Sequence, residues 1–126
     1  MSTRFLGEGN LGADAEFKEF AHDSAAPSRL LRMTVYFDNP VPKSDGFEDK
    51  GGFWAPVELW HADAERWCHL FRTGMRVLVD GRMVRDDWRD QDDNARVTFK
   101  VRAKRIGILP FRIADVSLIP RDPAGS

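Results

Sequence analysis

Cysteine is almost missing from this chain of 126 residues, which has only Cys68. A single cysteine cannot close an internal disulfide, so we expect a protein of the reducing cytoplasm. Long apolar runs are missing too, and no stretch is long enough to cross a membrane. The first residues are interrupted by Gly7 and Glu8, so they lack the apolar centre of a secretion signal. These absences favour a cytoplasmic protein that has no membrane segment.

An excess of either charge is also missing. Lys and Arg total 19 and Asp and Glu total 20, so the formal net charge is −1. This balance argues against a protein that is basic over its whole surface, and it counts against nucleic-acid binding until a local group of cations is found. The length fits a single domain, which we place at residues 1–119, followed by a short disordered tail at residues 120–126.

No motif of catalysis or of a cofactor stands out. The sequence lacks a paired nucleophile and base, and it lacks a phosphate-binding loop with its lysine. Residues 7–12 match the glycine pattern of a dinucleotide site, but few residues precede them and no parallel-sheet repeat follows. Glycines that kink a strand explain this match better. His61, Cys68 and His69 lack metal-site spacing and a fourth ligand. We therefore predict a protein that is not an enzyme and holds neither metal nor cofactor.

Alternation of apolar and polar residues predicts strands along much of the chain. In Leu30–Asp38 the odd-numbered positions are apolar, and Phe53–Trp60 repeats this pattern. Arg76–Trp88 reads as a long strand that bends at Gly81. The other expected strands are Phe5–Leu11, Arg96–Arg105 and a weaker candidate for an edge strand at residues 111–118.

One helix is expected, over Ala62–Thr73, because Ala64, Trp67 and Phe71 recur at helical spacing. Residues 39–52 are polar and read as a long loop. The fold class is therefore all-β. Closing five strands into a Greek-key barrel, with the short helix between the third and fourth strands, would hide the sheet edges. The candidate edge strand near the end of the chain would add to this barrel.

All four tryptophans lie between Phe53 and Trp88. Trp54 and Trp60 fall on the polar face of one predicted strand, and Trp88 ends another. Trp67 falls in the predicted helix, where packing against the core explains it. Large indoles on a polar strand face exceed what a core needs, so Trp54, Trp60 and Trp88 are candidates for a binding surface.

The strand predicted at Arg96–Arg105 has one face that is basic at every position except a threonine. Its cations could neutralise phosphate groups, although exposed cations on a strand are usually only a solvated face. Aspartates cluster nearby, at residues 86–93, and would repel phosphate, so we expect them at a loop tip away from any nucleic acid. The candidate phosphate contacts are Arg82, Arg96, Lys100, Arg102 and Lys104.

Several stretches resemble the bacterial single-stranded DNA-binding protein family. The resemblance extends without large gaps from the first strand to Arg105, and the pieces are specific only in combination. They are Gly9-Asn10-Leu11-Gly12 followed by Asp14; Phe53–Trp60; Leu70–Gly74 followed by Arg76–Gly81; and Arg82–Trp88 followed by Asp90.

The resemblance implies an oligonucleotide-binding (OB) fold, a homo-oligomer (dimer or tetramer), and single-stranded DNA as partner, with bases stacked on Trp54, Trp60 and Trp88. The family has a further aromatic residue near the end of its second strand. Here Tyr36 or Phe37 could take that place, and strand parity favours Tyr36 as the exposed ring. The expected function is sequence-independent binding during DNA replication, recombination, repair or mobile-element processing.

One departure from the family concerns the end of the chain. Cellular members continue into a linker and an acidic tip that recruits partners, whereas residues 119–126 contain no such tip. Recruitment by that route is therefore not expected, and a plasmid, phage, mobile-element or primosomal relative fits as well as a cellular form. A protein-interaction or assembly module that kept the barrel but binds DNA weakly or not at all is the alternative.

Overall fold

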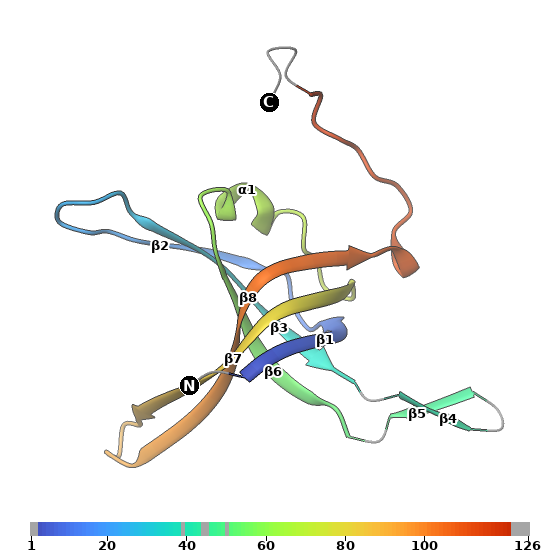
Figure 1. Ribbon diagram of the computed structural model, residues 1–126, viewed down its shortest axis with the longest axis horizontal. Coiled ribbons are helices and arrows are strands. Elements are labelled where there is room, and N and C mark those ends of the chain that lie inside the picture. The colour runs from blue at the N-terminus through green and yellow to red at the C-terminus, as the bar shows by residue number, and fades with distance from the viewer. Residues whose placement is uncertain (1–2, 39, 44–45, 50, 122–126) are drawn as a thin grey trace.

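The computed structural model describes residues 3–38, 40–43, 46–49 and 51–121. Figure 1 shows strands that wind around a barrel and hairpins that project from it. In chain order the elements are β1 (Thr3–Leu11), β2 (Glu16–Phe20), β3 (Ser28–Phe37), β4 (Pro40–Lys43), β5 (Gly46–Asp49), β6 (Phe53–Trp60), α1 (Ala64–Cys68), β7 (Arg76–Arg89), β8 (Ala95–Leu109) and the 3-10 turn η1 (Pro110–Arg112).

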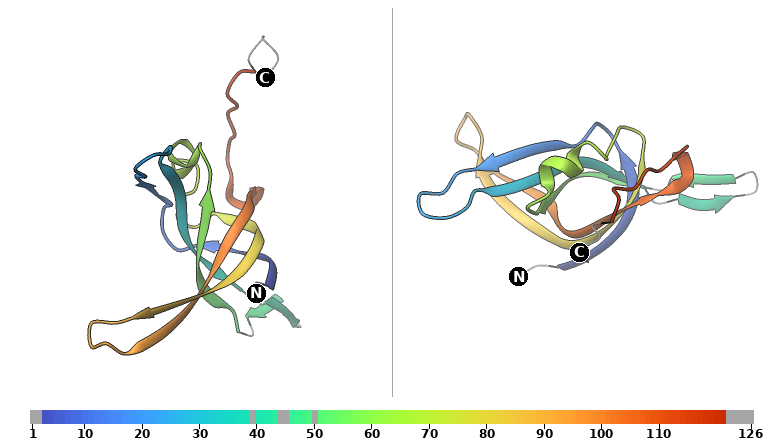
Figure 2. Two further views of the ribbon diagram at one scale, coloured as in Figure 1. Left: turned by 60° about the vertical axis from the view of Figure 1, so that its left-hand side comes forward. Right: turned by 90° about the horizontal axis from the view of Figure 1, so that it is seen from above.

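Five strands close the barrel. Each strand bonds to the next in the order β1-β7-β8-β6-β3, and β3 pairs again with β1. The pairs are antiparallel except for β6 with β8, which is parallel. Seen from above, α1 lies over one end of the ring (Figure 2). This is the five-stranded OB-fold barrel, with a short helix between its third and fourth strands, that the sequence predicted.

Two features hold the closure in place. Gly9 sits where β1 meets β3, and a Cβ atom there would lie 2.2 Å from the carbonyl oxygen of Tyr36, so only glycine fits. Arg76 on β7 donates to Asp38 at 2.6 and 2.8 Å, and to Glu8 at 2.8 Å. Both carboxylates, Asp38 most strongly, raise the pKa of this guanidinium further above its ordinary value. The ion pairs tie β7 to β1 and to the end of β3.

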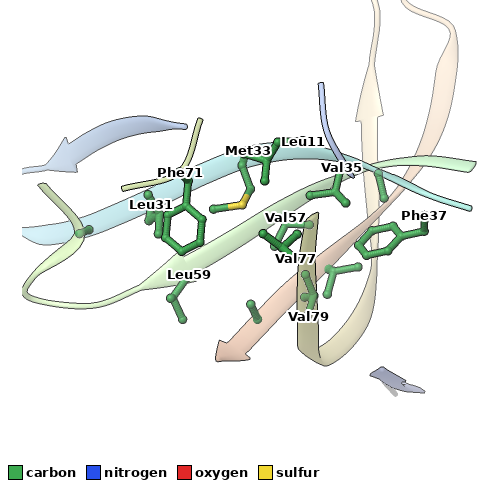
Figure 3. Packing of buried hydrophobic residues seen from close by; sticks show 14 residues of the cluster. Leu11, Leu31, Met33, Val35, Phe37, Val57, Leu59, Phe71, Val77 and Val79 are labelled. Carbon is green, nitrogen blue, oxygen red and sulfur yellow. The ribbon is translucent and has the colours of Figure 1, made fainter. Parts of the chain in front are cut away.

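The inward-facing side chains fill the barrel (Figure 3). The alternation predicted from the sequence places Leu31, Met33, Val35 and Phe37 of β3 inside, together with Ala55, Val57 and Leu59 of β6. The bend at Gly81 is also confirmed, because β7 continues through it with a shift of register against β8. The buried cluster comprises Leu11, Leu31, Met33, Val35, Phe37, Ala55, Val57, Leu59, Ala64, Phe71, Val77, Val79, Val101 and Ala103.

Some local expectations are wrong. β2 was not predicted, because Phe17 and Phe20 have opposite parity and its five residues show no alternation; it extends the sheet beside β3. The stretch 39–52, expected to be a loop, contains the paired strands β4 and β5. The helix is shorter than expected and ends at Cys68, and beyond it the carbonyl of Phe71 accepts a hydrogen bond from the amide of Ala15.

The expected strand at residues 111–118 is absent. β8 instead runs to Leu109, and Pro110, which has no amide hydrogen to donate, begins the turn η1. Residues 113–121 are not in a helix or strand, and they lead away from the barrel (Figure 1). The sheet therefore has no added strand from this part of the described chain.

The hairpin of β7 and β8 extends well beyond the barrel as a two-stranded arm, which Figures 1 and 2 show projecting from it. We use "the arm" for residues 84–100. Val97 and Phe99 share a strand face with the buried Val101, yet both are exposed. The parity is right, but the barrel ends before these residues, so nothing covers their side. Phe53, on the apolar face predicted for β6, is also exposed, at the start of the strand.

Candidate nucleic-acid interface

Trp54 presents the largest uncovered indole on the outer face of the barrel, with 60% of its surface exposed. It pairs across the strands with Tyr36, and the two ring centroids lie 5.2 Å apart at an interplanar angle of 55°. A Cβ atom at Gly12 would lie 2.5 Å from the ring of Trp54, so the indole rests where glycine leaves room. Phe37 is buried, and the parity argument for Tyr36 as the outward ring is correct.

The bend that contains Gly12 is held by Asp14. This carboxylate accepts hydrogen bonds from the backbone amide and the hydroxyl of Thr73, at 2.8 and 3.0 Å, and from Arg72 at 3.3 Å. These donors, the Thr73 amide first, hold the pKa of Asp14 below its usual value. Asp14, the acidic residue that follows the first-strand motif, therefore stabilises the bend beneath Trp54.

Trp60 stands at the other end of β6. Its ring lies 5.6 Å from that of Phe20 on β2, and 41% of its surface is exposed. Trp67 does not join this surface, because it stacks on His61 at 4.2 Å and packs against the core, as the sequence predicted. The residue Phe20 was not identified from the sequence, since β2 itself was missed.

Trp88 lies on the arm, and its indole is 47% exposed. Its Nε1 donates a hydrogen bond of 2.8 Å to the hydroxyl of Thr98 on the facing strand, which limits rotation of the ring. Phe99 is exposed on the opposite face, so the arm carries an aromatic ring on each side. The sequence could not reveal Phe99 as a surface residue, because its exposure depends on how far the β7–β8 hairpin extends beyond the barrel.

The five cations proposed from the sequence fall into two groups. Arg96 donates to Asp90 at 2.8 Å, and Lys100 lies 3.1 Å from Glu58, so each has a carboxylate partner within the protein. The second group is exposed and forms no ion pair with any residue that the structure describes. It consists of Arg82, Arg102 and Lys104.

The aspartate cluster is only partly at a loop tip. Asp90 begins the turn of the arm and accepts backbone hydrogen bonds from Asp92 and Asn94, at 3.0 and 2.9 Å. The Asn94 amide, followed by Arg96, holds the pKa of Asp90 below its usual value. Asp86 and Asp87, by contrast, lie within β7, so the expectation of a loop is wrong for them. Their carboxylates are neighbours of cations on the arm itself.

Other kinds of site find no support in the described part of the chain. It contains no group of three or more His, Cys, Asp or Glu side chains that could hold a metal ion. None of its helices is long and apolar enough to span a bilayer.

Known proteins with similar sequences share one description. A protein from Corynebacterium glutamicum named single-stranded DNA-binding protein is 29% identical over 114 residues, which cover 90% of this chain and 50% of that protein. One of the same name from Wolinella succinogenes is 27% identical over 109 residues, or 86% of this chain and 65% of its own. The chain therefore spans between half and two thirds of these relatives.

Solved structures show the same fold. A small single-stranded DNA-binding protein from Streptomyces coelicolor superposes with a TM-score of 0.70 at 16% identity, over 86% of this chain and 94% of that one. A deletion mutant of the single-stranded DNA-binding protein from Thermus aquaticus gives 0.64 at 21% identity, over 89% and 52%. The model of the single-strand binding protein family matches residues 3–109, and the chain belongs to that family.

Proposed function

We propose that the protein binds single-stranded DNA without sequence preference, by stacking bases on its exposed tryptophans and pairing its cations with phosphates. The observation that carries this proposal is the uncovered indole of Trp54, supported by Gly12 and Tyr36 on the outer face of the barrel. Every base has a π face, so stacking tolerates any sequence and contributes about 1–3 kcal/mol per base.

Trp54 and Trp88 take the leading roles, and Tyr36 widens the surface beside Trp54. Trp60 offers a third ring, with part of its area against Phe20. Each exposed ring can stack on an unpaired base, whereas bases inside a duplex keep their faces covered. The protein should therefore bind single strands in preference to duplex DNA.

The phosphate contacts are proposed to differ in strength. Arg82, Arg102 and Lys104 can meet a phosphate without losing an internal partner. Arg96 and Lys100 can do so only by exchanging Asp90 or Glu58 for the phosphate, so their net contribution is smaller. Binding should weaken as salt rises, because phosphate contacts release counterions.

We place this binding in the cytoplasm, during replication, recombination, repair or mobile-element DNA processing, and without catalysis by the protein. Its binding partner is then the exposed strand itself.

We also propose that the protein forms a homo-oligomer, a dimer or tetramer. The segment after β8 exposes Phe111, Val116, Leu118 and Ile119. An open apolar cavity of about 590 Å³ lies between α1, β6 and the end of β8, with Ile108 in its wall. Apolar surface of this kind is typical of subunit contacts. The same surface favours the alternative function, an interaction module with weak or no DNA binding.

Titration of the protein with oligo-dT, followed by its tryptophan fluorescence, tests the proposal. Quenching is expected for the wild type, with affinity that falls with salt. Trp54→Ala and Trp88→Ala should each lower the affinity about 5- to 150-fold, which corresponds to the stacking energy above. Trp67→Phe is the matched control, since that ring packs on His61, and should bind as tightly as the wild type. Absence of binding at low salt would favour the interaction module.

A further inference from the structure

Strands β6 and β8 pair along only part of their length. Their parallel ladder joins Val57 to Val101 and Glu58 to Arg102. β6 ends soon afterwards, whereas β8 continues to Leu109 with β7 along one of its edges. Among the strands that the structure describes, none pairs with the other edge of β8 beyond Arg102. Backbone N–H and C=O groups on such an edge are a template for one more strand.

The apolar cavity of about 590 Å³ opens beside this edge, between β8, β6 and the chain that follows α1. We call it the seam cavity. Its volume is in the range of roughly 300–1,000 Å³ that is typical of ligand pockets. Three of its lining side chains are large, apolar and exposed, and they are Trp60, Leu70 and Ile108. Apolar surface that is left open in this way marks a place for an apolar occupant.

The segment after η1 has apolar side chains that nothing covers. Residues 113–121 are in neither a helix nor a strand, and Val116 and Leu118 are 70% and 83% exposed. In an extended chain, Val116 and Leu118 point to one side, and Asp115 and Ser117 point to the other. Residues 114–118 therefore have the pattern of a strand with one apolar side.

The start of this segment is held on the β7 side of β8. η1 packs against β7, and Nη1 of Arg112 lies 2.7 Å from the place that a Cβ atom at Gly74 would take. The seam cavity lies beyond the opposite edge of β8, toward β6. From η1 the segment leads away from the barrel (Figure 1). It would have to cross the end of β8 to fill the cavity of its own barrel, so a second copy of the chain is the better source.

We propose that residues 114–119 of a second copy add as a strand to the free edge of β8, with Val116 and Leu118 in the seam cavity. This inference rests on the homo-oligomer of the proposed function and specifies its contact. Main-chain hydrogen bonds to the edge hold the added strand, and its alternate side chains fill the cavity. Two copies can each donate one segment and accept the other, which closes the dimer.

The outer side of the added strand is matched in charge. Ala103 is buried, whereas Lys104 beside it is exposed at the rim of the cavity. A strand with Val116 turned inward places Asp115 on this outer side. Neither Lys104 nor Asp115 has an ion-pair partner among the residues that the structure describes, so the two can pair across the contact. This pair removes Lys104 from the proposed phosphate contacts and leaves Arg82 and Arg102 open.

Disulfide cross-linking tests the contact. Leu70→Cys, in the cavity wall, and Leu118→Cys, in the segment, are made in separate chains that both carry Cys68→Ser, with a tag on one chain. Oxidation of an equimolar mixture should give a covalent dimer of the two different chains. In the control mixture Val97→Cys replaces Leu70→Cys, because Val97 and Leu70 are 47% and 48% exposed but Val97 lies on the arm. The control mixture should give no covalent dimer.

The double variant Leu70→Cys/Leu118→Cys separates the two sources of the segment. A disulfide within one chain, seen as a covalent monomer, would mean that the segment folds onto its own barrel, and it overturns the inference. A mixture without the covalent dimer, or a control mixture that forms as much of it, overturns the inference too.

Light scattering of the wild type shows which proposal has failed. An oligomer whose variants do not cross-link contradicts only this contact, whereas a monomer at every concentration contradicts the proposed homo-oligomer as well. Quenching by oligo-dT in the same samples tests base stacking separately.

Charge reversal tests the placement of the strand. Lys104→Asp and Asp115→Lys should each raise the Kd of the dimer, by up to about 5-fold for an exposed ion pair. The double variant Lys104→Asp/Asp115→Lys should return it toward the wild-type value, because the pair is restored with its signs exchanged. Losses that add up in the double variant contradict this placement.

Discussion

The ammonium group of Lys100 lies 3.1 Å from the carboxylate of Glu58, and their side chains are only 20% and 12% exposed. The pair joins β8 to β6 where these strands run parallel. A cation that the sequence suggests as one more phosphate contact is therefore engaged in an ion pair between β8 and β6.

This pair predicts that Lys100→Gln lowers stability more than DNA affinity. It leaves a largely buried carboxylate without its charged partner, at a cost of roughly 1–3 kcal/mol. The midpoint of urea unfolding should fall, and Glu58→Gln in the same chain should restore part of it. The salt slope for oligo-dT should remain near the wild-type value. A slope reduced by about 0.7, as expected for the loss of one phosphate contact, with stability intact, would contradict this assignment.

Gly12→Ala should weaken DNA binding through Trp54. The added Cβ would lie 2.5 Å from the indole and must displace the ring. The loss in affinity for oligo-dT should approach, but not exceed, that of Trp54→Ala, which is about 1–3 kcal/mol. Gly107→Ala is the matched control, because a Cβ there meets no atom within 4 Å. Fluorescence titration measures both, and equal affinities for the two variants would show that the ring position is unimportant.

Thr98→Val should loosen Trp88. The hydroxyl that accepts the indole hydrogen bond is lost while the shape of the side chain is kept. On an exposed arm the bond is worth about 0.5–1.5 kcal/mol at most, so a loss of a few-fold in affinity is expected. Time-resolved anisotropy, in a variant whose other tryptophans are phenylalanine, should show faster motion of the ring. Unchanged motion would mean that other contacts hold it.

Asp14→Asn should lower stability at neutral pH and flatten the acid side of the stability profile. Because the folded-state pKa of Asp14 is depressed, its stabilisation is present above the unfolded-state value of 3.8 and is lost as the pH falls through the folded-state value. Urea midpoints of wild type and variant should therefore differ at pH 7 and converge below pH 3.8. Asp23→Asn, in the loop after β2, is the control. A constant difference at all pH values would contradict a role for the charge.

Leu118→Asp should reduce self-association. It places a charge on the exposed apolar segment after β8, which would have to be desolvated in a subunit contact. Light scattering after size exclusion should show a smaller mass at equal concentration. Val97→Asp makes the same change at an exposed apolar position on the arm and should keep the wild-type mass. If both variants keep it, this segment is not the subunit contact.

The sequence by itself determined the barrel, the outward side of Tyr36 and the packing role of Trp67. These features depend on alternation and spacing within a few residues, which strand and helix geometry converts directly into a face. The family motifs added the OB fold as the form that this barrel takes. The short strand β2 could not be predicted, because its apolar residues Phe17 and Phe20 do not alternate with the polar ones.

Only the tertiary structure decided which exposed residues can serve a ligand. Phe99 is exposed because the β7–β8 hairpin extends beyond the barrel. Lys100 forms an ion pair because β6 places Glu58 beside it. Arg4, Arg82 and Arg102 are far apart in the chain and meet only through the register of three strands. Pairing register and strand reach are set by closure of the whole sheet, and no local pattern encodes them.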